Sequence, residues 1–317
     1  MHTVKCIKTY GLIGCFYKAW NKLIKCELPK GLGYFFSRSF LRKTIIKTYD
    51  GSGQSVHPDI IEYQKKIFMA FTPYPFGIDT YENPCIAMWN NKQWTLIPGA
   101  NPLIKENDFK WHLSDPCLFV YQGYLVLLYR KTEKANSKNS SLFITKSSNG
   151  FKWEQPYDLK LPLGKDYISP AIIYTQQVHL VYIDTDQERN KAMILSGNSL
   201  ECLDSIEEIE LQGFNNEKIW HVGVSAEENW NKKHSSNSRF DCLITTITKE
   251  GEYKLYFGNL YFCQGWILKI KSEVIPEELK KEILYKSSFA VVENKKYIFI
   301  SWKDHRGRWK ISKYLSE

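Results

Sequence analysis

The organisation of the chain is clearest in Gln54-Ser55-Val56-His57-Pro58-Asp59-Ile60-Ile61, a polar cluster with a proline that leads into an apolar run. Two further short apolar runs follow, Lys66-Ile67-Phe68-Met69-Ala70-Phe71 and Tyr81-Glu82-Asn83-Pro84-Cys85-Ile86-Ala87-Met88. The connector between them, Thr72-Pro73-Tyr74-Pro75-Phe76-Gly77, is rich in turn residues. Short runs of this kind, bounded by turn residues, predict three consecutive β-strands with a polar head on the first.

The polar-headed strand recurs four more times along the chain. The later heads are Ser114-Asp115-Pro116-Cys117, Ile168-Ser169-Pro170-Ala171, Trp220-His221-Val222-Gly223 and Tyr285-Lys286-Ser287-Ser288. They are spaced by roughly 50 to 65 residues, which is the length of a four-stranded blade with its loops. The sequence therefore predicts an all-β chain in which residues 51–317 form a five-bladed β-propeller. The high aromatic content, 15% of the residues, suits such a fold.

Residues 1–50 differ from the rest of the chain in charge. They carry ten Lys or Arg against two acidic residues, so +8 of the chain's net charge of +9 lies there. Leu12, Phe16, Trp20 and Leu23 recur at helix-like spacings among the lysines. We interpret the segment as a basic N-terminal extension that packs on the propeller, with an anchor for an anionic membrane surface or an acidic protein as the alternative.

Composition and motifs exclude several classes of function. Residues 51–317 are nearly neutral and lack a nucleic-acid-binding motif, so no nucleic-acid partner is expected. Phosphate-binding glycine loops, a zinc-protease motif and a serine-hydrolase elbow are all missing from the sequence. The eight cysteines show no spacing typical of a zinc site, which favours free thiols. Free thiols predict a cytoplasmic location, and the protein would be peripheral to a membrane if residues 1–50 bind one.

In a propeller, the first strand of every blade lines the central funnel, and the heads of these strands converge at one end of it. We therefore expect one pocket to be ringed by polar residues from all five blades: His57, Asp59, Ser114, Asp115, Ser169, His221, Ser287 and Ser288. A pair of carboxylates across such a pocket is what hydrolysis of a glycosidic bond requires, one as acid and one as base or nucleophile.

The heads also carry a resemblance to a known group. The order and spacing of His57-Pro58-Asp59-Ile60, Tyr81-Glu82-Asn83-Pro84, Ser114-Asp115-Pro116, Ser169-Pro170-Ala171-Ile172 and Trp220-His221-Val222-Gly223-Val224 resemble the five-bladed propellers of glycoside hydrolase families 43, 32 and 130, including relatives from bacteria and phages. The resemblance covers residues 51–317. It implies a carbohydrate substrate and an inverting mechanism with a base Asp in blade one, a second Asp in blade two and an acid Glu in blade three.

Carried over to this chain, Asp59 matches the base and Asp115 the second Asp, while Ser169 stands where the acid Glu belongs. This departure puts ordinary hydrolysis in doubt, because protonation of the leaving group contributes about two to four powers of ten in rate. Glu82 is the candidate replacement. The structural alternative is that Glu82 and Asn83 only hold the connector before them by hydrogen bonds.

Six residues are candidates for substrate binding: His57, Asn83, Arg130, Ser169, Trp220 and His221. Five of them also have a structural interpretation. The histidines can be hydrogen-bonded core residues, the Asn83 amide can hold a loop, and Trp220 can be part of the core. Arg130 can be exposed to solvent or paired with Asp115. No cofactor or metal site is predicted. Members of the resembled group can hold Ca²⁺ in the funnel, but no run of ligands here requires it.

We therefore expect a glycoside hydrolase-like enzyme that cleaves a poly- or oligosaccharide by acid/base catalysis at the funnel. A phosphorylase variant, in which phosphate replaces the attacking water, would use two or more Arg, Lys or His at the funnel. We rank it below hydrolysis because the candidates are limited to His57, His221 and Arg130. The alternatives from another class are a non-catalytic glycan-binding propeller and a scaffold in surface-polysaccharide assembly, with residues 1–50 as a docking arm.

Overall fold

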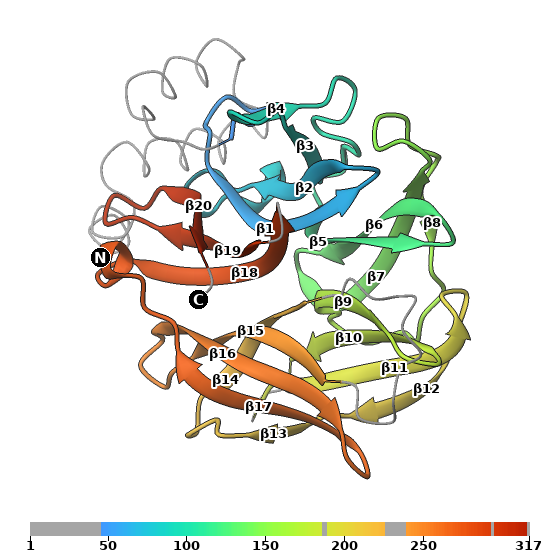
Figure 1. Ribbon diagram of the computed structural model, residues 1–317, viewed down its shortest axis with the longest axis vertical. Helices are drawn as coiled ribbons and strands as arrows, with labels where there is room; N and C mark the ends of the chain where they lie inside the picture. Colours follow the sequence, from blue (N-terminus) through green and yellow to red (C-terminus); the bar gives the residue numbers. More distant parts are fainter. Residues whose placement is uncertain (1–45, 186–188, 226–238, 293–294, 316–317) are drawn as a thin grey trace.

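The computed structural model describes residues 46–185, 189–225, 239–292 and 295–315. These residues form five small sheets arranged around a central axis (Figure 1). The predicted five-bladed β-propeller is thus confirmed, and its five first strands begin within a few residues of the predicted heads. Among these residues, no helix is long and apolar enough to cross a membrane.

Within every blade, strands that follow one another in the chain pair in antiparallel order. Blade one comprises β1 (Ser55–Tyr63), β2 (Lys66–Pro73), β3 (Cys85–Trp89) and β4 (Trp94–Leu96). Blade two comprises β5 (Trp111–Tyr121), β6 (Tyr124–Glu133), β7 (Asn136–Ser147) and β8 (Tyr157–Asp158). Blade three comprises β9 (Ile168–Tyr174), β10 (Val178–Asp184), β11 (Lys191–Ser199) and β12 (Cys202–Glu208).

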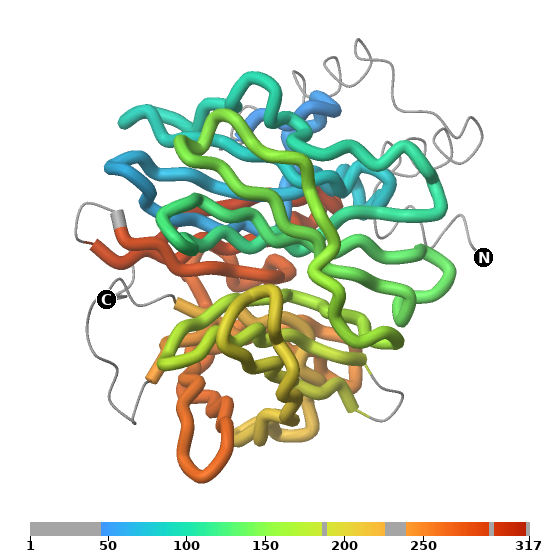
Figure 2. The backbone as a smooth tube through the Cα atoms, turned by 90° about the vertical axis from the view of Figure 1, so that its right-hand side faces the viewer, coloured from blue at the N-terminus to red at the C-terminus, as the bar shows by residue number. Residues whose placement is uncertain are grey.

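Blade four comprises β14 (Lys218–Val224), β15 (Arg239–Ile247), β16 (Tyr253–Phe262) and β17 (Trp266–Glu273). The short β13 (Glu210–Gln212), from the link after blade three, pairs in parallel with β17. Blade five comprises β18 (Ile283–Val292), β19 (Lys295–Lys303) and β20 (Trp309–Leu315). In the side view of Figure 2, the teal strands of blade one lie above the yellow-green strands of blade three.

The hydrophobic core is divided into clusters that lie between neighbouring blades. Leu128 of blade two and Leu180 of blade three belong to one such cluster, and Ile183 and Ile244 join blades three and four in the next. The strands are apolar on both faces because each sheet is covered by a neighbour on either side. This packing closes the ring and leaves few strand edges exposed.

Blades five and one are joined partly by the described end of the basic segment. Ile46 is buried against side chains of both blades, including Phe71 and Phe299. The side-chain oxygen of Gln54 accepts hydrogen bonds from the backbone N–H groups of Phe76 and Trp309, 3.0 and 3.2 Å away. Residues 1–45, and with them most of the predicted membrane or protein contact, lie outside the described residues.

Each first strand has a bulge at its polar head, where its pairing with the second strand shifts. In blades one to three the residue before the proline has a positive φ: 55° at His57, 52° at Asp115 and 54° at Ser169. This backbone conformation is uncommon for residues other than glycine. These three residues therefore occupy equivalent positions in their blades, and the bulge sets the direction in which the flanking side chains point.

Candidate functional site

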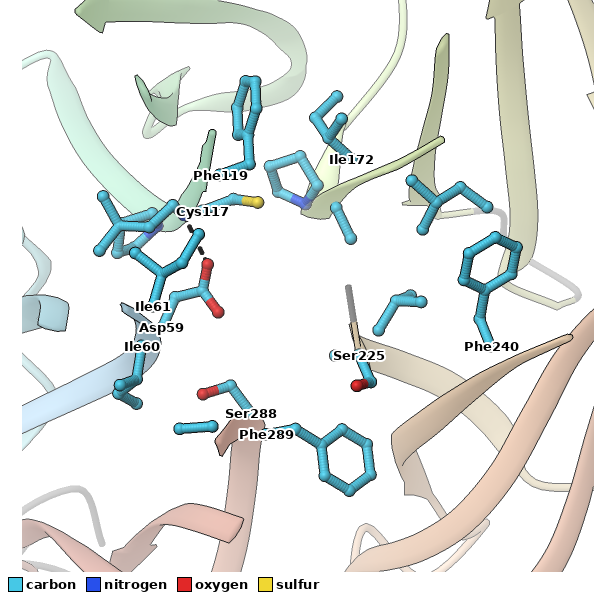
Figure 3. A pocket seen from close by; sticks show the side chains of 18 of the residues that line it. Asp59, Ile60, Ile61, Cys117, Phe119, Ile172, Ser225, Phe240, Ser288 and Phe289 are labelled. Atoms are coloured by element: carbon cyan, nitrogen blue, oxygen red, sulfur yellow. Dashed lines mark hydrogen bonds between the residues drawn. The ribbon is translucent and has the colours of Figure 1, made fainter. Parts of the chain in front are cut away.

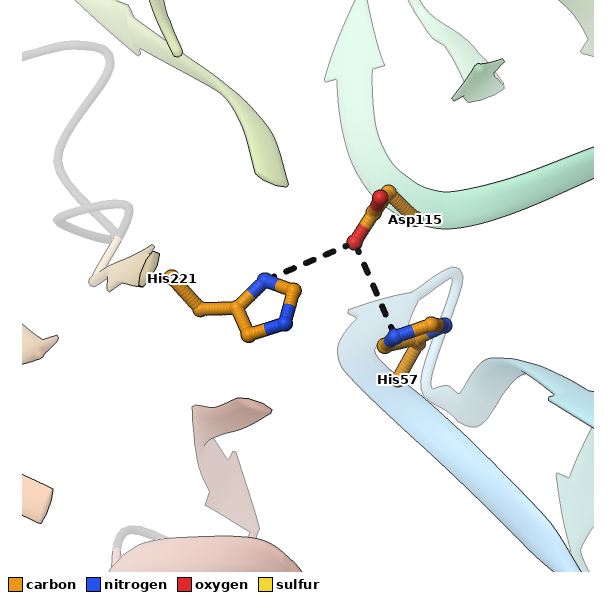
Figure 4. A group of neighbouring side chains, drawn as sticks. All are labelled: His57, Asp115 and His221. Atoms are coloured by element: carbon orange, nitrogen blue, oxygen red, sulfur yellow. Dashed lines mark ion pairs between the residues drawn. The ribbon is translucent and has the colours of Figure 1, made fainter. Parts of the chain in front are cut away.

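A compact polar cluster is built from the heads of three blades. His57 of β1, Asp115 of β5 and His221 of β14 point toward one another (Figure 4). The distance from Asp115 Oδ1 to His57 Nε2 is 3.8 Å, and that to His221 Nδ1 is 3.6 Å. All three side chains are buried, each at most 3% exposed. The ring that closes the propeller therefore brings together residues more than 160 positions apart in the chain.

Asp115 is the negatively charged centre of this cluster. Arg130 Nη2 lies 3.3 Å from its Oδ2, and Lys286 Nζ lies 3.5 Å from its Oδ1. Burial alone raises the pKa of Asp115, but its interactions with the neighbouring His57 ring and with the cations Lys286 and Arg130 outweigh burial and hold the pKa well below its ordinary value. Asp115 is thus a carboxylate at neutral pH.

The two histidines are neutral. Burial lowers the pKa of His57 to about 3 and lowers that of His221 well below its ordinary value. His57 Nδ1 lies 3.0 Å from Thr72 Oγ1, which leaves Nε2 directed at Asp115. His57 Nε2, Asp115 Oδ1 and both ring nitrogens of His221 are buried and have no hydrogen-bond partner among the described residues. Such groups are costly to bury, so a bound partner is expected.

A divalent metal ion fits this set of atoms. The three ligand atoms lie within 4.8 Å of one another. Around a tetrahedral zinc with bonds of about 2.0–2.2 Å, ligand atoms are about 3.4 Å apart, only a few tenths of an ångström less than the two distances to Asp115. Neutral imidazole and carboxylate are also the forms in which these side chains bind metals. The sequence predicts no metal site because the three ligands come from three different blades.

Glu82 and His112 extend the cluster. Glu82 Oε1 lies 3.6 Å from His57 Nδ1, and Glu82 Oε2 lies 3.8 Å from His112 Nε2. Burial and the nearby carboxylates of Asp115 and Asp79 raise the pKa of Glu82 well above its ordinary value. Burial lowers the pKa of His112 to about 4. Glu82 is therefore protonated more readily than an ordinary glutamate, and it can donate that proton.

A cavity of about 460 Å³, which we name the mouth cavity, lies beside the cluster, although His57, Asp115 and His221 are not part of its described lining. Its lining includes His112, Arg130 and Trp220, each in contact with or next to a member of the cluster. Trp220 Nε1 donates a hydrogen bond to Tyr285 Oη over 3.2 Å, which holds the indole ring beside His221. The mouth cavity thus combines an aromatic ring with charged groups, as carbohydrate sites require.

Asp59 does not join Glu82 and Asp115, contrary to the expectation that the three share one pocket. Its carboxylate accepts a hydrogen bond of 2.5 Å from the backbone N–H of Leu118 and faces a second cavity, whose described lining includes none of His57, Glu82 and Asp115. The cause is the bulge between Val56 and Asp59, which points residues 57 and 59 toward different ends of the channel. The position equivalent to Asp115 in blade one is therefore held by His57.

The other predicted site residues have mixed outcomes. The Ser169 hydroxyl donates to Val222 O over 2.9 Å and accepts from Val222 N over 3.2 Å, so it links blades three and four. Asn83 holds loops, because its amide donates to Tyr49 Oη and accepts from Glu106 N. Arg130 pairs with Asp115, as one of the two sequence interpretations proposed.

Sequence reasoning missed two members of the site, His112 and Lys286. His112 lies three residues before Asp115 in the run His112-Leu113-Ser114-Asp115, a signal that was available in the sequence. Lys286 belongs to the fifth head, where only the serines were selected. It is 4% exposed, and a buried lysine is recognised only once its partner, here Asp115, is known.

Solved structures share this architecture. The chain is similar to an N-acetylgalactosamine deacetylase from F. plautii in complex with blood group B trisaccharide, with a TM-score of 0.66 and 14% identity over 83% of this chain and 90% of that one. It is similar to the family 43 endo-arabinanase from Bacillus licheniformis, with a TM-score of 0.57 and 12% identity over 85% and 96% of the two chains. It is also similar to an α-L-arabinofuranosidase from Lactobacillus brevis, with a TM-score of 0.59 and 11% identity over 83% and 90%.

These similarities establish the fold. No protein-family model and no curated protein matches the sequence. The function therefore has to be argued from the site itself.

Proposed function

We propose that this propeller is a metal-dependent hydrolase that removes an acyl group from a carbohydrate bound in the mouth cavity. The observation that carries the proposal is the trio His57, Asp115 and His221, whose buried ligand atoms have no hydrogen-bond partner among the described residues. Two neutral imidazoles and one carboxylate form a ligand set that leaves coordination positions open for water and substrate. The F. plautii deacetylase, which was solved with a trisaccharide, supports an acylated sugar as the substrate class.

The surrounding residues have distinct roles in this reaction. A metal ion held by His57, Asp115 and His221 would act as a Lewis acid. Water adds to the acyl carbon as the bond from that carbon to the leaving nitrogen or oxygen breaks. Glu82 gives its proton to the leaving atom, and the resulting carboxylate takes up a proton from the added water. Arg130 holds Asp115 in place through its contact with Oδ2. Oδ1, which faces both histidines and Lys286, would be the oxygen that binds the metal. Trp220 offers its ring to a sugar at the wall of the mouth cavity.

The test is release of acetate from N- and O-acetylated sugars, assayed with the intact protein after chelation and after readdition of Zn²⁺, Mn²⁺ or Ca²⁺. We expect hydrolysis to require one of these ions. It should fall by about two to four powers of ten in Glu82→Gln, the range expected for loss of a proton donor. His221→Ala should lose both metal binding and turnover. Full activity in chelator would contradict the metal-dependent mechanism.

Glycoside hydrolysis is the second candidate. The observation that favours it is the pair Glu82 and Asp115, both in contact with His57, with pKa values displaced in opposite directions. An acid and a base separated in this way are what a glycosidase uses. Release of reducing sugar from polysaccharides or aryl glycosides, lost in both Glu82→Gln and Asp115→Asn, would favour this candidate. Glycan binding without any turnover would instead indicate a binding module.

A further inference from the structure

The second cavity occupies the other part of the central channel. It has a volume of about 630 Å³ and is lined by the first strands of all five blades, β1, β5, β9, β14 and β18. The polar cluster lies near the start of these strands, and the cavity extends along the remainder of them. We name it the far cavity. The proposed hydrolysis does not use the far cavity.

The far cavity has a mixed lining in which apolar groups slightly predominate. Its apolar side chains include Phe119, Ile172 and Phe289 of the first strands and Phe240 of β15 (Figure 3). A concave apolar space of this volume is typical of sites for small organic molecules. Orientation of a ligand in such a site depends on the few polar groups that it contains.

Two of these polar groups are Asp59 and Ser288, which project into the far cavity (Figure 3). Asp59 has a second carboxylate oxygen beyond the one that accepts from Leu118 N. Ser288 is 4% exposed, and its Oγ is buried without a hydrogen-bond partner among the described residues. A buried hydroxyl without a partner, aimed into a cavity, indicates a ligand that can hydrogen-bond to it.

The charges favour a cation. Lys286 also lines the far cavity and attracts Asp59, but its ammonium contacts Asp115 Oδ1 and Pro116 O, each 3.5 Å away, and so belongs to the polar cluster. Asp59 and the rim residue Glu62 are the acidic groups of the described lining.

We propose that the far cavity binds a protonated primary amine with a compact apolar body, whose ammonium group lies between the Asp59 carboxylate and Ser288 Oγ. The ammonium donates to both oxygens, and the apolar body contacts the aromatic and aliphatic walls. The proposal is independent of the hydrolase function, because it uses none of the residues assigned to that reaction.

Three probes of similar shape test the charge requirement: phenethylamine, phenethyl alcohol and 3-phenylpropionate. Each is titrated into the intact protein and followed by calorimetry and by ligand-observed NMR. We expect the amine to bind at least about tenfold more tightly than the alcohol, the equivalent of one charge-assisted hydrogen bond, and the carboxylate not to bind. Equal affinities for amine and alcohol would overturn the cation requirement, and failure of all three to bind would overturn the site.

Variants locate the binding. Asp59→Asn should lower the affinity for phenethylamine by about tenfold or more, and Ser288→Ala should lower it by a smaller factor. Glu62→Gln is the matched control, because it removes an exposed carboxylate at the rim and should leave the affinity nearly unchanged. Ala171→Leu fills part of the cavity without changing its charge. It should abolish phenethylamine binding and leave the proposed hydrolysis unchanged. Unchanged affinity in a folded Asp59→Asn protein would place the amine elsewhere.

Discussion

The two ends of the channel are made by the same repeated bulge, yet they differ in chemistry. At the cluster end lie the residues before the prolines, His57, Asp115 and Ser169. The residues after those prolines, Asp59, Cys117 and Ala171, all line the far cavity. A separation of two positions in β1 thus decides whether a side chain joins a charged network or faces an apolar space. The chemistry of each end follows from the side of the bulge on which a polar residue stands.

The largest difference is expected when the two aspartates are neutralised. Asp115→Asn leaves the buried Lys286 and the partly buried Arg130 without their carboxylate, and we expect it to lower the free energy of unfolding by about 3–5 kcal/mol. Asp59→Asn removes a charge that burial disfavours, and we expect it to leave the free energy of unfolding at pH 7 unchanged or to raise it. Urea denaturation of the two variants and the wild type measures both effects.

Leu113→Ala serves as the reference for this comparison, because it removes a buried apolar side chain of the same strand as Asp115 without changing any charge. If Asp59→Asn proved as destabilising as Asp115→Asn, the proposed difference between the two aspartates would be wrong. Asp59 would then take part in an ion pair of similar strength.

The second difference is in pH dependence. Burial lowers the pKa of His57 from 6.5 to about 3, so between these values the unfolded chain binds a proton that the folded protein does not. The free energy of unfolding therefore falls as the pH falls, by about 1.4 kcal/mol per pH unit. Burial raises the pKa of Asp59 from 3.8 to about 6, so its contribution has the opposite sign and weakens the protein as the pH rises through that window.

Denaturation of chelator-treated protein between pH 4 and 7 separates the two effects. Relative to wild type, His57→Gln should gain stability as the pH falls, and Asp59→Asn should gain stability as the pH rises. Difference curves with the same slope would show that the two residues, which are two positions apart in β1, share one environment.

The same comparison explains how far the sequence could be interpreted. The number of blades and the start of each first strand were predictable, because polar heads and apolar runs are local patterns repeated five times. The membership of the site was only partly predictable. The sequence predicts Asp115, Glu82, His57 and His221 as members. It also groups Asp59 with them, because the polar heads are expected to converge as units, whereas a bulge changes the face of every residue beyond it. The contact between Lys286 of blade five and Asp115 of blade two could not be predicted, because it forms only when the ring of blades closes.

The third prediction concerns Lys286, which lies between the two ends. Its ammonium contacts Asp115 Oδ1, the same oxygen that is available to a metal, so it repels a cation bound there. Lys286→Met should tighten Zn²⁺ binding by about tenfold, which corresponds to about 1.4 kcal/mol. The same change should strengthen phenethylamine binding in the far cavity, because Lys286 also opposes a cation near Asp59.

Lys295→Met, at an exposed lysine of the same blade, controls for the loss of one positive charge from the protein. Calorimetric titration of the two variants gives both affinities. An unchanged Zn²⁺ affinity in Lys286→Met would mean that the lysine moves away from Asp115 when the metal binds, and that the two ends are electrostatically separate.

The smallest effect is expected at Ser169, which stands at the cluster end by position but not by contact. Its hydroxyl is occupied by both backbone groups of Val222. Ser169→Ala leaves a buried N–H and a buried carbonyl without this partner, so we expect a loss of about 1–2 kcal/mol in the free energy of unfolding and no change in kcat. A fall in kcat with KM and stability unchanged would assign Ser169 to the reacting centre, and the cluster would then extend to the third blade.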